Sequence, residues 1–193
     1  VIEATGFPAA GIEHARQAFQ SGKHIIMVNV EADVLAGAAL VKEANSAGVV
    51  YSMAYGDQPA LTAEIIEWAR ASGFNVTSAG KGTRYQPIYH KSSPDTVWDY
   101  YGLTHEEAKK AGMNPKMFNS FLDGTKSGLE MAAIANACDL DVPTNGLVFP
   151  PCGMDDLANV LKPIKAGGFL EKNGQVEVAV SYTHLRAHET ACN

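Results

Sequence analysis

The stretch HIIMVNVEADVLAGAALVKEANSAGVVYSMAY, residues 24–55, decides the fold class. It begins with an almost continuous apolar run, residues 24–30, and ends with another, residues 49–55. Residues 33–47 between them have the length and composition of a helix, and Gly48 is the type of residue that ends one. Two apolar strands joined by a helix predict a parallel βαβ unit, because parallel strands need a crossover and are buried on both faces.

The same alternation extends in both directions. Residues 1–5 read as the end of a buried strand, which a helix follows over residues 11–19. Residues 59–71 predict a further helix and residues 74–80 a fourth strand. Strands that alternate with helices predict an α/β protein, and we assign residues 1–82 to the second half of a Rossmann-type doubly wound parallel sheet, a partial nucleotide-binding domain. In the third helix we expect an inward face made of Leu61, Ile65, Trp68 and Ala69.

Residues 83–180 have a different texture and predict an incomplete α+β substrate domain. A short helix should begin at Thr104, with Glu107 completing a capping box. Residues 115–138 predict one long buried helix, because they are apolar or small around most of its circumference. The last residues of this domain predict a β-hairpin that turns at Asn173 and Gly174.

Charge and cysteine content exclude several classes of protein. The net charge is −6, and the lysines and arginines are too scattered to form a nucleic-acid interface. The three cysteines have no spacing typical of a zinc site or of a disulfide framework, which favours a reducing cytoplasm. The longest apolar runs are far shorter than the roughly 20 residues that span a bilayer. We therefore expect a cytoplasmic protein that binds a small molecule and neither nucleic acid nor membrane.

Polar residues follow the first two strands, where ligands of doubly wound sheets bind. Thr5, Gly6 and Pro8 would let the backbone approach a cofactor closely, although the same residues also make an ordinary strand-to-helix turn. After the second strand, polar and apolar residues alternate, which would place three polar side chains on one side. These three are Asn29, Glu31 and Asp33. A substrate or metal role for Glu31 competes with helix capping by Asp33.

Two further strand ends carry candidate groups. Asp57 and Gln58 could face the substrate, or Asp57 could simply cap the next helix. Lys81 lies between Gly80 and Gly82, an arrangement suited to an anionic ligand, with a solvated surface lysine as the alternative.

The predicted long helix carries a polar stripe. Its members are Asn119, Asp123, Lys126 and Glu130, spaced so that all four share one side of a helix. Because the other sides are mostly apolar, the stripe should line a cavity or pair internally. We expect Lys126 to act as a proton shuttle or carbonyl-orienting cation, with Asp123 as its main partner and Glu130 sharing that role or binding metal.

Several motifs in chain order carry a resemblance to a known family. They are VIEATG, GKHIIMVNVEADV, GVVYSMAYGDQPA, AGKGTRY, PDTVWDYYG, MFNSFLDGTKS, MAAIANA and FPPCGMDDL. Together they resemble bacterial predicted homoserine dehydrogenases with a C-terminal SAF domain, a family that includes the 1-deoxy-D-xylulose-5-phosphate reductoisomerase-like enzymes. The resemblance covers nearly all of residues 1–180.

The resemblance implies an NAD(P)-dependent oxidoreductase that exchanges hydride with a small hydroxy or keto substrate, which could be phosphorylated. It implies cofactor contacts from Thr5, Gly6, Pro8 and Asn29, catalytic roles for Lys81, Asp123 and Lys126, and substrate contacts from Glu31, Asp57, Gln58 and Asn119. A divalent metal would have Glu31, Asp33 and Glu130 as candidate ligands. Val30 stands where a homoserine dehydrogenase usually has lysine, which leaves Lys81 and Lys126 as substitutes.

Two other functions fit the same residues. One is a non-catalytic ligand sensor that keeps the nucleotide fold, and the other is a metal-dependent lyase or isomerase without nicotinamide. By comparison with the family, we expect the chain to be an internal piece of a longer enzyme that forms homo-oligomers. The GxGxxG fingerprint would then precede Val1, and the piece by itself should be inactive. Residues 181–193, including His184, His188 and Glu189, resemble sequencing-adapter read-through, so we expect a non-native tail.

Overall fold

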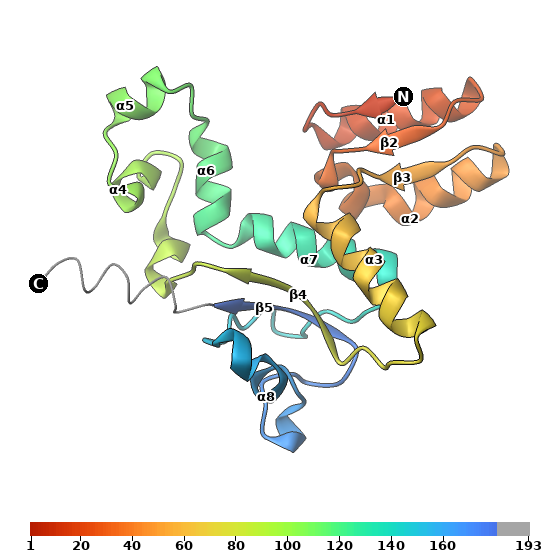
Figure 1. The fold of residues 1–193 in the computed structure, drawn as a ribbon. Helices are drawn as coiled ribbons and strands as arrows, with labels where there is room; N and C mark the ends of the chain where they lie inside the picture. The colour runs from red at the N-terminus through yellow and green to blue at the C-terminus, as the bar shows by residue number, and fades with distance from the viewer. Residues whose placement is uncertain (181–193) are drawn as a thin grey trace, which may run out of the picture.

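The computed structural model describes residues 1–180 and contains two parallel sheets. The first sheet has the order β1-β2-β3, with β1 at Ile2–Glu3, β2 at Ile25–Met27 and β3 at Tyr51–Met53 (Figure 1). Its strands pair in parallel, Ile26 lying beside both Ile2 and Ser52. The βαβ prediction for residues 24–55 is confirmed, and the fold is that of part of a Rossmann-like α/β protein. The expectation that these strands are buried on both faces is wrong, since Ile2 is 71% exposed and Ile26 43%.

Two helices pack against this sheet and against each other. Helix α1, Pro8–Gln20, follows β1, and helix α2, Val30–Ser46, follows β2. Their apolar sides meet the strand residues in one core, which includes Ala15, Phe19, Ile25, Met27, Leu40 and Ala44.

Helix α3, Gln58–Ala71, does not cover this sheet. It packs against helix α7 and strand β4 instead, through Ile66 and its neighbours. The expected inward face is therefore wrong for its three largest members: Leu61 is 39% exposed, Ile65 64% and Trp68 66%. Helical periodicity identifies the apolar side of a helix but not the element against which that side packs. In α3 the buried isoleucine is Ile66, one position after the expected Ile65.

The second sheet consists of β4, Ser78–Thr83, and β5, Gln175–Val180, which pair in parallel along their whole length. The prediction that the fourth strand joins the first sheet is therefore wrong, and so is the hairpin at Asn173 and Gly174. Strand β5 pairs with β4, almost a hundred residues away in sequence. A reason lies at Gly80, where a Cβ atom would stand 1.8 Å from the backbone oxygen of Glu177.

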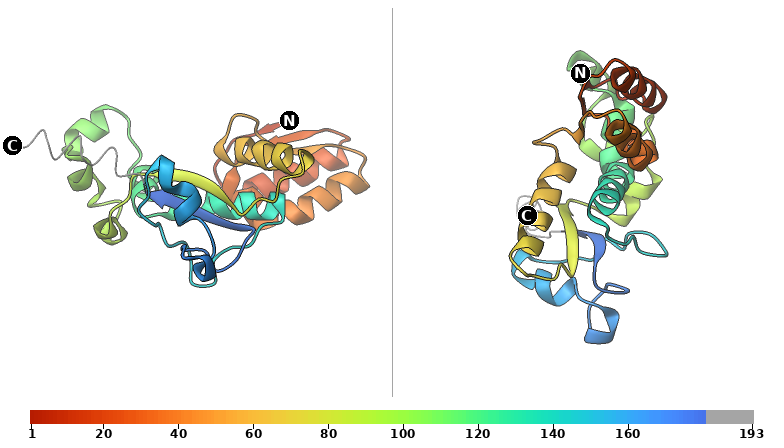
Figure 2. Two further views of the ribbon diagram at one scale, coloured as in Figure 1. Left: turned by 60° about the horizontal axis from the view of Figure 1, so that its bottom comes forward. Right: turned by 90° about the vertical axis from the view of Figure 1, so that its right-hand side faces the viewer.

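The expected single helix over residues 115–138 is two helices. Helix α6, Pro115–Leu122, ends at Asp123, and α7, Thr125–Cys138, begins after Gly124. Gly124 has φ +90°, a conformation that interrupts a right-handed helix and that glycine adopts easily. Helix α7 contacts α2, α3, α6 and β5, and Figures 1 and 2 show it between the first sheet and the α4–α6 segment.

The remaining elements are short. Helix α4 spans Val97–Tyr101 and α5 His105–Lys110, where the predicted capping box of Thr104 and Glu107 is confirmed. Helix α8 is Leu157–Val160, and three 3-10 turns lie at Pro87–Lys91, Met154–Asp156 and Ile164–Ala166. Within residues 1–180 we find no helix with the length and apolar content needed to cross a bilayer. The predicted tail, with His184, His188 and Glu189, lies outside the described residues.

Candidate active site

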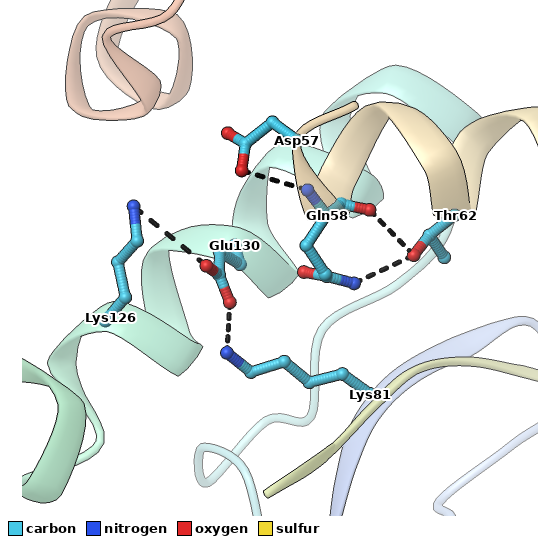
Figure 3. A network of polar contacts seen from close by, with 6 residues as sticks. All are labelled: Asp57, Gln58, Thr62, Lys81, Lys126 and Glu130. Carbon is cyan, nitrogen blue, oxygen red and sulfur yellow. Dashed lines mark hydrogen bonds and ion pairs between the residues drawn. The ribbon is translucent and has the colours of Figure 1, made fainter. Parts of the chain in front are cut away.

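A buried carboxylate between two lysines forms the centre of the candidate site. Glu130 of α7 is only 6% exposed. Its Oε2 bonds directly to the ammonium group of Lys81 from β4, and its Oε1 lies 4.0 Å from Nζ of Lys126, one turn earlier in α7 (Figure 3). The side chains of Lys81 and Lys126 are 21% and 25% exposed. Two lysines against one carboxylate leave a net positive charge, which would attract an anionic or partially negative oxygen atom of a ligand.

Local sequence explains how these groups meet. Lys126 and Glu130 are four residues apart in α7, so they share one side of that helix. Lys81 reaches them from β4, which runs past α7. Strand β4 pairs closely with β5 because Gly80 has no side chain to collide with the β5 backbone. The sequence predicted Lys81 and Lys126 separately, and the tertiary structure joins them through Glu130.

The first turn of α3 lies beside this cluster (Figure 3). Asp57 caps the helix, because its Oδ1 accepts a hydrogen bond from the Gln58 backbone at 2.9 Å. This is the capping alternative of the sequence interpretation. Gln58 donates from Nε2 to the hydroxyl of Thr62 at 2.8 Å. Thr62 was not identified from the sequence, since a threonine one turn into a helix gives no functional signal by itself.

Asn119 and Asp123 belong to the junction between α6 and α7. Asn119 is buried and donates to Asp123 Oδ2 at 2.8 Å, while Asp123 Oδ1 accepts from the backbone of Thr125 at 2.8 Å. The carboxylate thus fastens the start of α7. The ion pairs of residues 1–180 join Lys126 to Glu130 and not to Asp123, so the expected Asp123–Lys126 pair and the single four-residue stripe are both wrong. The break at Gly124 changes the direction of the chain between them.

The polar residues after β2 lie in a helix and not in a strand. Asn29 is the N-cap of α2, with Oδ1 accepting from the Ala32 backbone at 3.1 Å, and it is 2% exposed. Glu31 and Asp33 lie in the first turn of α2. The expected alternation along a strand and the assignment of Asp33 as N-cap are therefore wrong, since the helix begins three residues earlier than predicted.

Asp33 is buried and accepts a hydrogen bond from the Tyr51 hydroxyl at 2.7 Å. Burial raises the pKa of this carboxyl group, and the bond from Tyr51 only partly opposes the effect. The pKa of Tyr51 is also raised, by burial first and then by the neighbouring Asp33. The two groups form a structural contact between α2 and β3.

The turn after β1 lies exposed on the surface. Gly6 has φ +68°, and a Cβ atom there would meet nothing within 4 Å. Thr5 is exposed and Pro8 begins α1. Beneath the turn lies Glu3, a buried carboxylate that the sequence did not reveal, since it occupies a strand position expected to be apolar. Burial acts to raise the pKa of Glu3, but bonds from Thr5 and His14 outweigh it and lower the pKa.

A cavity of about 990 Å³ lies over the β4–β5 sheet. Lys81 forms part of its wall, together with residues of α3 and of the α8 region that include Thr62, Ile66, Cys152 and Met154. Burial raises the pKa of the Cys152 thiol. Lys81 is the member of the lysine–glutamate cluster that lines this cavity, and the cavity is large enough for a small organic molecule.

The candidate metal ligands do not converge. Nowhere in residues 1–180 do three histidine, cysteine, aspartate or glutamate side chains gather in a way that could hold a metal ion. Glu31 and Asp33 belong to α2, and Glu130 belongs to α7 with both carboxylate oxygens facing lysines. These residues do not fit a divalent metal.

The sequence profile described as "Oxidoreductase DRL, catalytic domain" matches residues 56–187, well over half of the chain, so the chain belongs to this oxidoreductase family. The match includes Gln58, Lys81, Lys126 and Glu130, and its last seven residues fall in the segment that we expect to be non-native.

Comparison with individual proteins adds little. None of the curated proteins matches the chain. One similar solved structure is an Archaeoglobus fulgidus protein provisionally named a homoserine dehydrogenase, with 17% sequence identity and a TM-score of 0.41. The similarity covers 71% of this chain and 42% of the other, so the chain spans less than half of that protein's length.

Proposed function

We propose that this chain carries part of an enzyme that exchanges hydride between NAD or NADP and a small hydroxy or keto substrate. The observation that carries the proposal is the Lys81–Glu130–Lys126 cluster, of which Lys81 lines a cavity, in a chain of an oxidoreductase family. Hydride transfer to a carbonyl leaves negative charge on its oxygen, and a cation or acid must stabilise or protonate it. Two lysines that share one buried carboxylate can supply both.

In this proposal the nicotinamide cofactor binds at the turn after β1. Its glycine has a positive φ and open space around it, so a ligand can approach the backbone closely. Thr5, Gly6 and Pro8 would hold the cofactor there, and when bound it would supply the hydride. Asn29 is a weaker candidate, because it is almost fully buried and its side-chain oxygen already caps α2.

Within the site, Lys126 would orient the substrate oxygen and move its proton. Its contact with Glu130 is long, at 4.0 Å, so its ammonium group has less to lose by turning toward a substrate. Lys81, bonded to Glu130, would fix the carboxylate and add positive charge. Asp57 and Gln58 would contact the substrate from the start of α3. The other candidates would contribute indirectly, by holding the structure around the site: Asn119, Asp123 and Glu31.

Two substrate classes remain the candidates of this proposal. The chain would act in a homoserine dehydrogenase-like or a deoxyxylulose-phosphate reductoisomerase-like enzyme of the cytoplasm, in a longer protein that carries a SAF domain. The absence of a converging metal-ligand set in residues 1–180 lends no support to the lyase alternative. The lysine cluster favours an enzyme over a sensor, since a sensor needs no proton-transfer group.

The proposal is tested by turnover. The longest reading frame that contains residues 1–180 should oxidise NADH or NADPH with a keto substrate, or reduce the cofactor with homoserine, as followed by absorbance of the reduced nicotinamide. Lys126→Met should lower kcat by about 10²-fold or more, the usual scale of acid-base contributions. Lys172→Met is the matched control, because Lys172 forms an exposed ion pair with Asp141.

The result is decisive if folding is measured beside turnover. A Lys126→Met protein that melts like the parent and has lost turnover supports the proposed role. A folded Lys126→Met protein with the parent's kcat would refute the role of Lys126. A parent that oxidises or reduces neither cofactor with any hydroxy or keto compound tried would refute the proposed function.

A further inference from the structure

Strand β4 is an edge strand of the second sheet. In the part of the chain that the structure describes, it pairs with β5 and with no other strand. All six residues of β5 are buried, whereas none of the six residues of β4 is. One side of β4 therefore lacks a neighbouring strand, although β5 covers its other side along the whole length.

The register shows which backbone groups of β4 lie on this open side. The carbonyl oxygen of Thr77, directly before β4, accepts bonds from the backbone of Gly174 and Gln175 at the start of β5. Successive strand residues direct their N–H and C=O groups to opposite edges, so every second residue from Thr77 onward faces β5. The residues between them face the open side: Ser78, Gly80 and Gly82. Within residues 1–180 no element other than β5 makes a backbone hydrogen bond to these three.

The open side of β4 forms the floor of a groove. The cavity of about 990 Å³ is lined by residues 75–84 without a gap. A cavity over one face of a strand would touch alternate residues, so this one follows the strand edge. Figure 1 shows β4 between α3 and α8, whose regions supply the mostly apolar walls. Ile65 in one wall is 64% exposed and Met154 in the other 80%, so both walls lack a cover.

We infer that this groove binds an extended segment of another polypeptide chain, which adds to the second sheet as a third strand beside β4. A strand carries N–H and C=O groups at the two-residue spacing that Ser78, Gly80 and Gly82 present. An apolar small molecule would fill the walls of the groove but leave these backbone groups without partners. The bound segment should therefore be extended, with apolar side chains where it meets α3 and α8.

The composition of β4 leaves its edge open to such pairing. Edge strands of native proteins are commonly protected by exposed lysines, by prolines or by bulges. Strand β4 has the sequence SAGKGT and pairs with β5 in an unbroken register, so it has neither proline nor bulge. Its one charged residue, Lys81, is bonded to the buried Glu130.

The charges that line the groove favour an acidic segment. Arg84 lies just after β4, is exposed, and forms no ion pair with any residue of 1–180. The acidic residue of the lining, Glu177, is already engaged, because its carboxylate accepts bonds from the backbone of Val148 and Phe149. A carboxylate of the bound segment would therefore lie at the Arg84 end of the groove.

The inference does not rest on the proposed function. A strand beside β4 would leave the lysine–glutamate cluster accessible through Lys126, which does not line the groove and whose side chain is 25% exposed. Binding of the segment and turnover are therefore measured separately.

Three peptides with the same side chains test the pairing. All have the sequence Ac-Glu-Val-Thr-Val-Thr-Val-Thr-Glu-NH2; one is unmodified, one is N-methylated on its valines and one on its threonines. Because alternate residues direct their N–H groups to opposite edges, only one of the methylated peptides loses its donors toward β4. Calorimetric titration of the reading frame used for turnover should show that peptide binding at least about tenfold more weakly than the other two.

Gly82 and Arg84 provide the protein variants. Gly82→Pro removes an N–H group from the open edge and should weaken binding of the unmodified peptide about tenfold. Gly82→Ala is its control, because it keeps the N–H group and its Cβ would meet nothing within 4 Å. Arg84→Gln should weaken the peptide about two- to fivefold, but not a peptide with glutamine in place of glutamate. Thermal melts show whether each variant is folded.

Several outcomes would overturn the inference. Equal binding of the two methylated peptides would mean that the strand edge takes no part in recognition. No binding of the unmodified peptide would mean that the groove is filled by the protein's own further residues or takes no strand. A folded Gly82→Pro protein that binds like the parent would also contradict it. Failure of peptide binding leaves the proposed function standing, and failure of turnover leaves this inference standing.

Discussion

The two lysines of the cluster should differ sharply in what they contribute to stability, although both face Glu130. Lys81→Met removes the cation bonded directly to a carboxylate that is 6% exposed. The remaining cation, Lys126, is 4.0 Å from the other oxygen. Breaking a buried ion pair by deleting one partner costs about 3 to 5 kcal/mol, because the other charge stays buried without compensation.

Lys126→Met leaves the Lys81–Glu130 bond in place. The loss is then that of an i,i+4 helix pair at the limit of contact, about 0.3 to 0.5 kcal/mol. For a protein of this size each kcal/mol shifts the melting temperature by about 2 to 4 °C. The expected decrease in Tm is therefore about 6 to 20 °C for Lys81→Met and at most about 2 °C for Lys126→Met.

Thermal unfolding followed by circular dichroism measures both shifts, and Lys172→Met serves as the control for removal of an exposed lysine. Equal shifts for the two site variants would refute the reasoning, since they would mean that the long contact is worth as much as the short one. A Lys81→Met protein as stable as the parent would show that Glu130 is not held as a buried ion pair.

Two further predictions concern the scaffold. Asp33→Asn should raise the Tm at neutral pH, because burial raises the folded-state pKa of Asp33 and so penalises its ionised form. The penalty grows as pH rises from the unfolded pKa of about 4 through the raised folded value, so the gain should vanish toward pH 4, and a gain that grows on acidification would contradict this cause. Gly80→Ala should destabilise the protein strongly in urea unfolding, because the new Cβ would lie 1.8 Å from a backbone oxygen of β5, whereas Gly82→Ala meets nothing within 4 Å and should change stability by less than about 1 kcal/mol. Similar losses for both glycine variants would show that β4 and β5 do not pair in the register described.

Local patterns in the sequence determined the elements that depend only on near neighbours. The apolar runs and the intervening helix of residues 24–55 predict the parallel unit that β2, α2 and β3 form. The capping box at Thr104 and Glu107 and the cap at Asp57 follow from side chains that reach no further than one helical turn. The two lysines of the site were also found, because charged residues stand out in apolar or glycine-rich surroundings.

Only the tertiary structure decided which of these elements meet. The sequence could not tell that β4 leaves the first sheet to pair with β5, since strand pairing depends on contacts between residues far apart in the chain. One glycine with a positive φ divides the expected long helix, and this changes the partner of Lys126 from Asp123 to Glu130. The sequence by itself therefore determined the fold class and the two lysines of the candidate site, while the pairing of these lysines with Glu130 came from long-range packing that no local pattern records.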